Sequence, residues 1–453
     1  MVQRPRLIRT AVRSSGLVAL IGLGLSEPTG ATGFFVNQQS VRGLGRVGAG
    51  SAAAGDDLGT IYFNPAGLTA IWADAGDSRT QISIGAHLII PRSDLHNRGS
   101  TASTPGTLGA VLPYFGSDAS NPTNPTPIPN LYWAHRLTQE AVVGFGVNFP
   151  FGLDATYNKN WFGRYDAIEA SLRTINLSVV GAYKFQSGIS VGGGLDFQYA
   201  STKLVSAIPN PLTPGGPIPA TDGRAETTGK DWTPGFNLGV LIPLSDDTRV
   251  GLHYRSAMKH TVDGSTLVTG LTGPLVLFNG RVGASAKLDL PAMASLGLTH
   301  ELSKELRLLA GIDWYDWSRF REVRIRFSNG NPDVVRPANY RDAFAFAFGA
   351  EYRSSSKLTT RAGIRFDQTP TVNGYRDSTV PDSNRLWLGI GATYRTSEKS
   401  WWDFAFNHVF FRSTDITPVR GFFEGSPAAS TIGINGRVKS VVNTLSVGYR
   451  HAF

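Results

Sequence analysis

The chain has 453 residues, and its 52 Gly, 25 Phe, 14 Tyr and 9 Trp residues are typical of many strands joined by turns. It contains no cysteine, which excludes disulfides, thiolate metal sites and a cysteine nucleophile. The formal charge of +9 is spread along the chain without a block of Lys or Arg, so we expect no nucleic acid among its partners.

Residues 1–31 have the order of regions found in a secretory signal peptide. A basic stretch with four arginines covers residues 4–13, an apolar run covers residues 16–25, and small residues follow up to Ala31. The apolar run is shorter than the about 20 residues that a membrane-spanning helix needs, which disfavours the alternative of a short membrane anchor. We therefore expect cleavage after Ala31.

Residues 32–75 are rich in glycine and alanine and show little of the alternation that marks a strand. They precede the first clear strand. An N-terminal segment of this kind can plug the lumen of a β-barrel, so we predict a hatch over residues 32–75 and a barrel over residues 76–453.

From residue 80 onward the chain repeats about ten residues of alternating character followed by a turn or a polar loop. This pattern is typical of transmembrane β-barrels, in which lipid-facing and lumen-facing side chains alternate. It predicts an all-β, antiparallel transmembrane barrel of fourteen strands, an even number as in bacterial single-chain barrels. The predicted strands cover residues 80–90, 129–137, 141–149, 170–185, 188–200, 231–242, 248–259, 286–300, 305–316, 341–353, 357–366, 385–395, 401–411 and 441–452.

Residues 343–352 show the alternation most clearly, with Phe344, Phe346 and Phe348 on one face and alanines on the other. The predicted links are alternately short and long, as expected of short periplasmic turns and long external loops. The chain ends on Phe453, and a terminal aromatic strand is what outer-membrane proteins present to the barrel-assembly machinery. These features predict a location in the bacterial outer membrane, in contact with its lipid and lipopolysaccharide.

Several elements of residues 33–71 occur together in the order found in one family. They are Asn37-Gln38-Gln39-Ser40, Gly43-Leu44-Gly45-Arg46, Ala54-Gly55-Asp56-Asp57 and Asn64-Pro65-Ala66. On these elements the segment resembles the N-terminal hatch of the long-chain fatty acid outer-membrane transporter (FadL) family. Later family-like stretches are Pro150-Phe151-Gly152-Leu153, Trp161-Phe162-Gly163-Arg164-Tyr165, Thr174-Ile175-Asn176-Leu177, Trp314-Tyr315-Asp316-Trp317-Ser318 and Pro381-Asp382-Ser383-Asn384-Arg385. The resemblance implies a monomeric fourteen-stranded barrel, closed by the hatch, that moves long-chain fatty acids or other hydrophobic compounds.

The resemblance also implies a gate at Asn64, Pro65 and Ala66, because the family's hatch moves near its Asn-Pro-Ala element. An asparagine can hydrogen-bond the surrounding backbone, and a proline fixes one backbone angle and removes a donor. The same tripeptide also suits an ordinary Asn-Pro turn. The residues alone leave both interpretations open.

A lateral opening is implied where the family's third strand kinks, which corresponds to Gly146, Pro150 and Gly152. A proline cannot donate to a strand ladder, and glycines weaken pairing. The alternative is a plain strand end, because prolines often close strands.

Four residues are candidates for binding the substrate. The hatch residues Phe34 and Phe35 would line an apolar pocket, although either can instead pack the plug against the wall. Arg336, at the place that matches a basic residue of the family, and Lys203 would bind a carboxylate head group; the alternative for each is a solvated loop charge.

Other classes of function find little support in the sequence. The G-x-G-x-x-G spacing at residues 43–48 has no strand before it, and the G-x-S-x-G spacing at residues 188–192 lies at the start of a strand. We therefore expect no cofactor, no metal and no catalytic residues. Three hypotheses remain: a channel for a fatty acid or an aromatic hydrocarbon, an outer-membrane lipid-modifying enzyme, and a porin or structural barrel.

Overall fold

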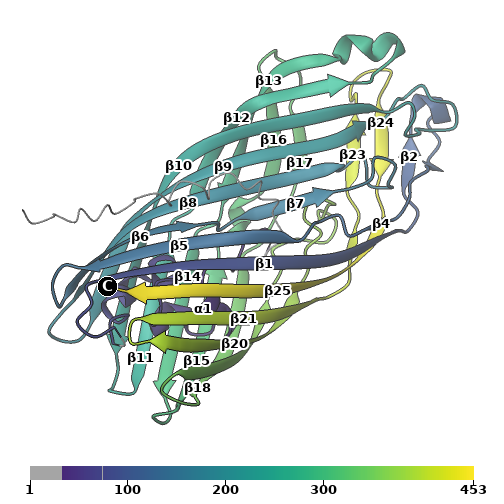
Figure 1. Cartoon of the computed structure of the whole chain (residues 1–453). Helices are drawn as coiled ribbons and strands as arrows, with labels where there is room; N and C mark the ends of the chain where they lie inside the picture. Colours follow the sequence, from purple (N-terminus) through teal and green to yellow (C-terminus); the bar gives the residue numbers. More distant parts are fainter. Residues whose placement is uncertain (1–32, 74) are drawn as a thin grey trace, which may run out of the picture.

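In the computed structural model, which describes residues 33–73 and 75–453, the chain forms a closed antiparallel barrel of fourteen strands (Figure 1). The first and last strands close the wall. Strand β1 (Thr80–Asn97) pairs with β25 (Gly436–Ala452) from Gln81 opposite Ala452 to Asn97 opposite Gly436. The predicted fold class is therefore confirmed, whereas the predicted signal peptide lies outside the described residues.

Each strand of the wall pairs with its neighbours in the sequence, as in an up-and-down meander. From β1 the order around the wall is β5 (Thr126–Arg136), β6 (Ala141–Asn148), β8 (Glu169–Lys184), β9 (Ser190–Ile208), β10 (Gly223–Pro243), β11 (Thr248–Arg255) with β12 (Met258–Thr269), β13 (Gly280–Leu290) with β14 (Met293–Glu301), β15 (Leu306–Tyr315) with β16 (Glu322–Phe327), β17 (Val334–Pro337) with β18 (Ala343–Arg353), β19 (Leu358–Asp367), β20 (Arg385–Ser397), β21 (Ser400–Phe411) and β25.

Shorter elements lie at one end of the barrel. Strands β4 (Ala119–Ser120), β7 (Gly152–Thr156) and β22 (Thr414–Ile416) pair with β1, β8 and β25 respectively. A separate small sheet consists of β2 (Thr101–Ser103), β3 (Leu112–Pro113), β23 (Val419–Phe422) and β24 (Ser430–Gly433). The 3-10 helices outside the N-terminal segment are η2 (Pro105–Thr107), η3 (Gly273–Phe278) and η4 (Trp317–Arg319). The long links therefore gather at the end opposite the C-terminus (Figure 1).

The outward face of the wall is apolar, as the alternation predicts. In β18 the side chains of Phe344, Phe346 and Phe348 are 40%, 45% and 53% exposed, whereas Ala343 and Ala345 are fully buried. A ring that is exposed on the outer face of a barrel faces lipid. The predicted two faces of residues 343–352 are thus confirmed.

Several strands extend beyond the predicted ends, by one or two residues toward the short links and by more toward the long links. The predicted loop 201–230 is shortened because β9 continues to Ile208 and β10 already begins at Gly223. The predicted loop 260–285 is likewise occupied by β12 and β13, and the predicted loop 317–340 by β16 and β17. In these extensions residues such as Arg224 and Lys230 replace the outward apolar side chains, so the amphipathic signal ends before the hydrogen-bonded ladder does.

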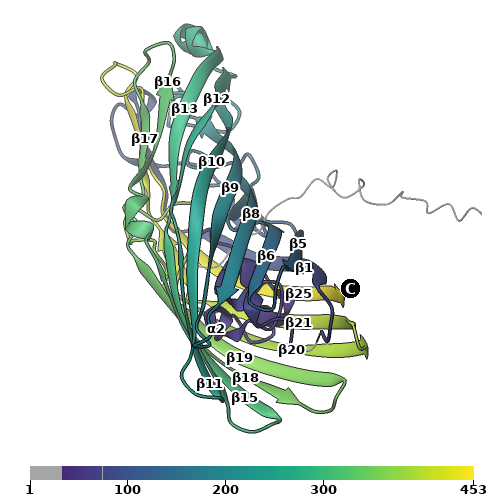
Figure 2. The same cartoon turned by 90° about the vertical axis from the view of Figure 1, so that its left-hand side faces the viewer.

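Residues 33–73 lie inside the barrel as short helices, α1 (Val41–Leu44), α2 (Ser51–Ala54), α3 (Thr60–Phe63) and η1 (Pro65–Thr69) (Figure 2). Their carbonyls accept hydrogen bonds from opposite sides of the wall: Asn407 of β21 donates to Leu44 O at 2.7 Å, and Arg255 of β11 donates to Tyr62 O at 3.0 Å. This N-terminal segment therefore fills the lumen near the short turns. Among the described residues, no helix is long and apolar enough to cross a membrane.

Candidate functional site

The predicted gate residues lie against the inside of the wall. Asn64 is fully buried and caps η1, where its Oδ1 accepts from the Ala66 N–H at 3.1 Å and Pro65 occupies the first turn. The Asn64 Nδ2 donates to Ala52 O at 2.6 Å and to Val240 O of β10 at 3.0 Å. The tripeptide thus ties the N-terminal segment to the wall, which an isolated Asn-Pro turn would not do.

Two wall glycines make this close approach possible. A Cβ atom at Gly239 would lie 1.9 Å from Asn64 Oδ1, and a Cβ atom at Gly192 would lie 2.4 Å from the Ala66 nitrogen. Any larger residue at either position would displace the tripeptide or the strand. The wall at β9 and β10 is therefore shaped to receive Asn64 and Ala66.

The residues predicted to form a lateral opening lie at a break in the wall. Strand β6 pairs with β8 up to Asn148, and the pairing with β8 resumes in β7 at Gly152, so that Pro150 lies outside the ladder. On the other side, β5 pairs with β6 only from Leu131 onward, and no pairing joins β5 to β7 in the described part of the chain. Gly146 still belongs to the paired part of β6.

The N-terminal segment covers this break. The Val36 N–H donates to Pro150 O at 2.8 Å, and the Gly152 N–H donates to Phe34 O at 2.9 Å. The segment thereby forms a short antiparallel bridge with the wall in place of the missing strand contact. Movement of the segment would expose the break.

The rings of Phe34 and Phe35 both contact the ring of Phe151, which belongs to the break. The ring centroids of Phe34 and Phe35 lie 6.3 and 5.6 Å from that of Phe151. Phe34 also contacts Trp317 at 4.7 Å, and Phe35 contacts Tyr315 at 5.2 Å. Both predicted residues are buried, and they pack the segment against the wall.

Phe34 also borders an apolar cavity of about 150 Å³. Aliphatic side chains from the wall and from the loops near the long links form most of its lining, among them Leu153, Leu172, Leu204, Leu288, Ile325 and Val380. Arg336, Lys203, Lys287 and Asp377 are the charged residues at its border. The structure therefore brings three of the four predicted binding residues to one cavity.

Lys203 and Arg336 differ in their position at this cavity and in their contacts. Along β9, Lys203 has the same parity as Leu195 and Phe197, which are exposed on the outer face. Its ammonium pairs with Glu169 at 2.8 Å. Arg336 lies opposite Val323, which lines the cavity, so Arg336 is the stronger candidate for binding an anionic head group.

Arg336 is held beside a buried carboxylate. Its Nη1 donates to the backbone carbonyl of Asp166 at 2.7 Å and lies 3.8 Å from the Asp166 carboxylate. Arg420 forms the closer ion pair with Asp166, at 2.7 Å. Burial raises the pKa of Asp166, but the positive charges of Arg420 and Arg336 lower this pKa by more. The pKa of Asp166 therefore lies below the usual value. Burial and the neighbouring Asp166 raise the pKa of Asp377.

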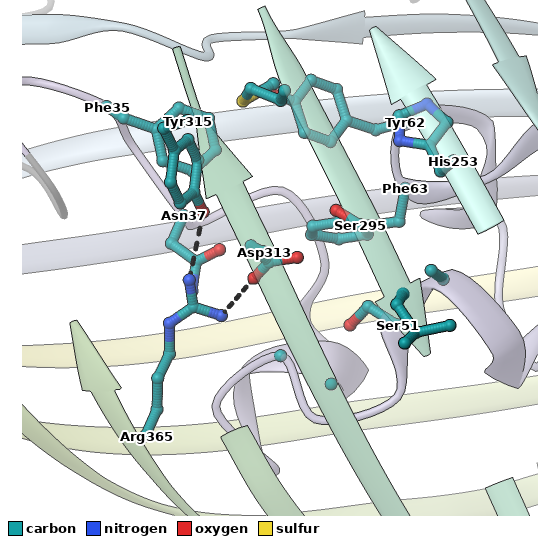
Figure 3. Close-up of a pocket in the computed structure, with 15 residues that line it drawn as sticks. Phe35, Asn37, Ser51, Tyr62, Phe63, His253, Ser295, Asp313, Tyr315 and Arg365 are labelled. Atoms are coloured by element: carbon teal, nitrogen blue, oxygen red, sulfur yellow. Dashed lines mark hydrogen bonds and ion pairs between the residues drawn. The ribbon is translucent and has the colours of Figure 1, made fainter. Parts of the chain in front are cut away.

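A second cavity of about 30 Å³ lies beneath Phe35 (Figure 3). Arg365 closes one side of it, donating to Asp313 Oδ2 at 2.8 Å and to the Tyr315 hydroxyl at 3.0 Å. A cavity of this size has room for about two water molecules, so it cannot hold an acyl chain. We call this small cavity the constriction.

Sequence reasoning missed several residues of this site. The side chain of Gln39 forms a hydrogen bond with a residue of the break, since its Nε2 donates to Phe149 O at 3.0 Å. Asp377 borders the cavity, and Arg365 and Asp313 border the constriction. The only sequence signal for Gln39 was its place in the Asn37–Ser40 element, because nothing local indicates that a polar side chain will complete a distant strand.

The whole chain is similar to known outer-membrane proteins. The family described as "Outer membrane protein transport protein (OMPP1/FadL/TodX)" matches residues 22–453. The long-chain fatty acid transport protein of Escherichia coli O6:H1 is 27% identical over 94% of this chain and 98% of its own length.

Two solved structures share the fold. A Pseudomonas aeruginosa FadL homologue has a TM-score of 0.78 and 23% identity over 93% of this chain and 100% of its own. The Ralstonia pickettii toluene transporter TbuX has a TM-score of 0.64 and 18% identity over 91% of this chain and 98% of its own. The family match covers both the lumen segment and the barrel. The chain therefore belongs to the OMPP1/FadL/TodX family of outer-membrane transport proteins.

Proposed function

We propose that this outer-membrane transporter of hydrophobic compounds imports long-chain fatty acids. The observation that carries the proposal is the apolar cavity bordered by Phe34 and Arg336. Each methylene group that leaves water there contributes about 0.8 kcal/mol. A guanidinium at the border adds a charge-assisted hydrogen bond to a carboxylate. The named fatty acid transporter among the relatives supports the same substrate class.

Residues 32–75 act as a hatch in this proposal. The constriction beneath Phe35 is too small for an acyl chain, and the segment is bonded to the wall through Asn64. A ligand that enters the cavity beside Phe34 displaces this ring from Phe151. Because Phe34 and Val36 also bridge the break, displacement would loosen the constriction and the lateral opening together.

The lateral opening lies between β5 and β7, around Pro150 and Gly152, with Gly146 in the paired strand beside it. The break would let a hydrophobic ligand leave the cavity through the wall into the membrane. Among the described residues, only the bridge to the N-terminal segment and the Gln39 side chain form hydrogen bonds to the backbone of Phe149 and Pro150. The neighbouring strands are otherwise fully laddered.

We further propose that the protein works as a monomer and as a transporter rather than as an enzyme. The wall closes on itself through β1 and β25 and needs no second chain. The outward aromatic rings would contact membrane lipid and lipopolysaccharide. The C-terminal strand, which ends at Phe453, would engage the barrel-assembly machinery during insertion.

Labelled oleate uptake tests this function in cells that lack their own transporter. The cells would carry the intact protein, a variant without Asn64, Pro65 and Ala66, or a control variant without three exposed loop residues, 425–427. Uptake by the intact and control proteins but not by the first variant supports hatch-gated import. No uptake by any of three correctly inserted proteins would reject fatty acids, and labelled toluene would then test the aromatic alternative.

A further inference from the structure

The wall has a further gap in its pairing, between β13 and β16 (Figure 2). These two strands pair over three residues only, and the pairing ends at Ala286 opposite Ile325. On the side of the short turns, pairing resumes between β14 and β15. In the described part of the chain, no pairing joins residues 287–291 to residues 317–324. We call this gap the second break.

The residues of the second break disfavour a closed ladder. Its two sides differ in length, since residues 287–291 face the longer segment 317–324, which takes up its excess in η4. On the shorter side, Pro291 has no backbone N–H to donate to a neighbouring strand. The gap is therefore built into the sequence of both segments.

A cavity lies on each side of the second break. The apolar cavity borders it from inside, and a groove of about 310 Å³ borders it from the other side. Thr261 and Lys287 face each other in the ladder, are exposed and line the groove, whereas their neighbours Val262 and Leu288 line the apolar cavity. Successive side chains of a strand point to opposite faces. The groove, which we call the outer groove, therefore lies on the outer face of the wall.

The outer groove lies on the external side of the lipid-facing band. In β14, which continues the same side of the wall toward the short turns, Leu296 and Leu298 are 43% and 39% exposed on the outer face. Apart from Ala286 and Phe320, every residue that lines the groove is polar or charged. Long links of such barrels are external, so the groove opens into the polar layer outside the hydrocarbon of the membrane.

The charges of the outer groove largely balance. Its lining has five basic and two acidic residues, but three of the arginines pair with the carboxylates of Asp316, Glu322 and Asp333. The described ion pairs leave a remainder of three charged lining residues, Lys287, Arg321 and Asp289. The groove is therefore a polar mouth that can hydrogen-bond a head group, and it does not depend on an excess of charge.

Phe320 forms part of the partition between the outer groove and the apolar cavity. Its side chain is buried and belongs to both linings, as do Ala286 and Lys287. The ring centroid of Phe320 lies 5.5 Å from that of Phe34, and Phe34 in turn contacts Phe151 beside the lateral opening. Rotation of the Phe320 ring would join the groove to the cavity.

We propose that the second break is an entrance, through which the hydrocarbon tail of an amphiphile passes from the outer groove into the apolar cavity when Phe320 turns aside. The polar mouth solvates the head group while the tail leaves water for the cavity, which favours entry tail first. The ligand would thus enter through the side of the barrel, without passing between the external loops. That the natural ligand is a fatty acid rests on the proposed function, whereas the entrance itself does not.

A bulky group attached at the mouth tests the entrance in the full-length, folded protein, because the chain has no native cysteine. Lys287→Cys places a thiol in the outer groove. Arg281→Cys is the matched control, since Arg281 is exposed on the same face of β13 but lines neither cavity. Both thiols are modified with a polyethylene glycol maleimide. Heat-modifiable migration on a gel confirms that each labelled protein is folded.

The readout is the rate at which 10-bromodecanoate and the neutral 10-bromodecanol quench tryptophan fluorescence. Trp317, which contacts Phe34, lies close to the cavity. An obstacle in a passage slows entry and release by the same factor and leaves the Kd unchanged, because it contacts neither the bound nor the free ligand. We expect both rates to fall about tenfold with the label at residue 287 and to stay unchanged with the label at residue 281.

Equal rates in the two labelled proteins would overturn the entrance. A raised Kd with an unchanged association rate would also overturn it, because residue 287 would then belong to the binding site. Phe320→Ala, which opens the partition, should raise the association rate of both probes. Binding of the alcohol without the acid would reject the fatty acid, and the rates of the alcohol would then decide the entrance. Failure of both probes to bind the unlabelled protein would overturn the apolar cavity as the site and with it the entrance.

Discussion

The side chain of Gln39 bonds to the backbone of Phe149 as a neighbouring strand would. Its Nε2 donates to Phe149 O at 3.0 Å, and its Oε1 accepts from the Phe149 N–H at 3.4 Å. Phe149 has left the ladder of the wall at this point. This amide group therefore adds a side-chain contact to the backbone bridge between the N-terminal segment and the break.

Replacing Gln39 by alanine should loosen the break. Loss of this pair of bonds removes about 1 kcal/mol of local stability, which is about a fivefold rise in the exchange rate of the protected amide of Gly152. Hydrogen exchange followed by mass spectrometry measures this change. Gln38→Ala is the matched control, since Gln38 is equally buried but bonds to Thr444 at 3.5 Å. Equal exchange in the two variants would contradict a role of this contact.

Gly239→Ala should disturb the gate without preventing assembly. The new Cβ would lie 1.9 Å from Asn64 Oδ1, so Asn64 must give up its present position. We expect oleate uptake to fall severalfold while the amount of barrel in the outer membrane stays unchanged. Gly181→Ala is the control, because the nearest atom to its Cβ, the Val142 carbonyl oxygen, is 3.9 Å away. Normal uptake by Gly239→Ala would argue against a gate at Asn64.

A bulky residue at the lateral opening should lower uptake. Gly152→Leu alters the bridge with Phe34, and Gly146→Leu brings a Cβ within 2.9 Å of the Tyr132 ring. Initial rates of oleate uptake, normalised to barrel yield, measure the effect, and Gly181→Leu serves as the control. If both variants transport at the control rate, the ligand does not leave through this break.

Arg336→Gln should weaken the binding of oleate more than that of oleyl alcohol. Loss of a charge-assisted hydrogen bond of about 1.5 kcal/mol corresponds to about a tenfold rise in the Kd of the acid. The alcohol has no negative charge and should bind the two proteins almost equally. Titration of the purified proteins in detergent measures both ligands. Equal losses for acid and alcohol would remove Arg336 from the head-group site.

Asp377 should make the binding of an anion depend on pH. Its pKa is raised by burial and by Asp166, so this carboxyl becomes neutral at a higher pH than an ordinary aspartate does. Neutralisation removes a negative charge from the border of the cavity. The affinity for decyl sulfonate, which stays charged, should therefore rise as the pH falls through this pKa. Asp377→Asn should bind as the acidic form does at every pH, and a retained pH dependence would contradict the assignment.

The sequence alone determined the barrel and the order of its parts. Alternation in stretches such as 343–352 reflects a local constraint, since each strand must show lipid and lumen different faces. The family element at Asn64 was also readable, because it is a short contiguous stretch. The strand extensions beyond residues 200 and 259 were not predicted, because ladder pairing outside the membrane does not require apolar side chains.

Only the tertiary structure decided which residues meet. Gln39 and Phe149 are far apart in the sequence, as are Asp166 and Arg420, and no local periodicity records their contact. Lys203 looked as suitable for a carboxylate as Arg336 until the structure showed that its ammonium already pairs with Glu169. Closure brings together one end of every strand, whereas a sequence pattern reports each strand by itself.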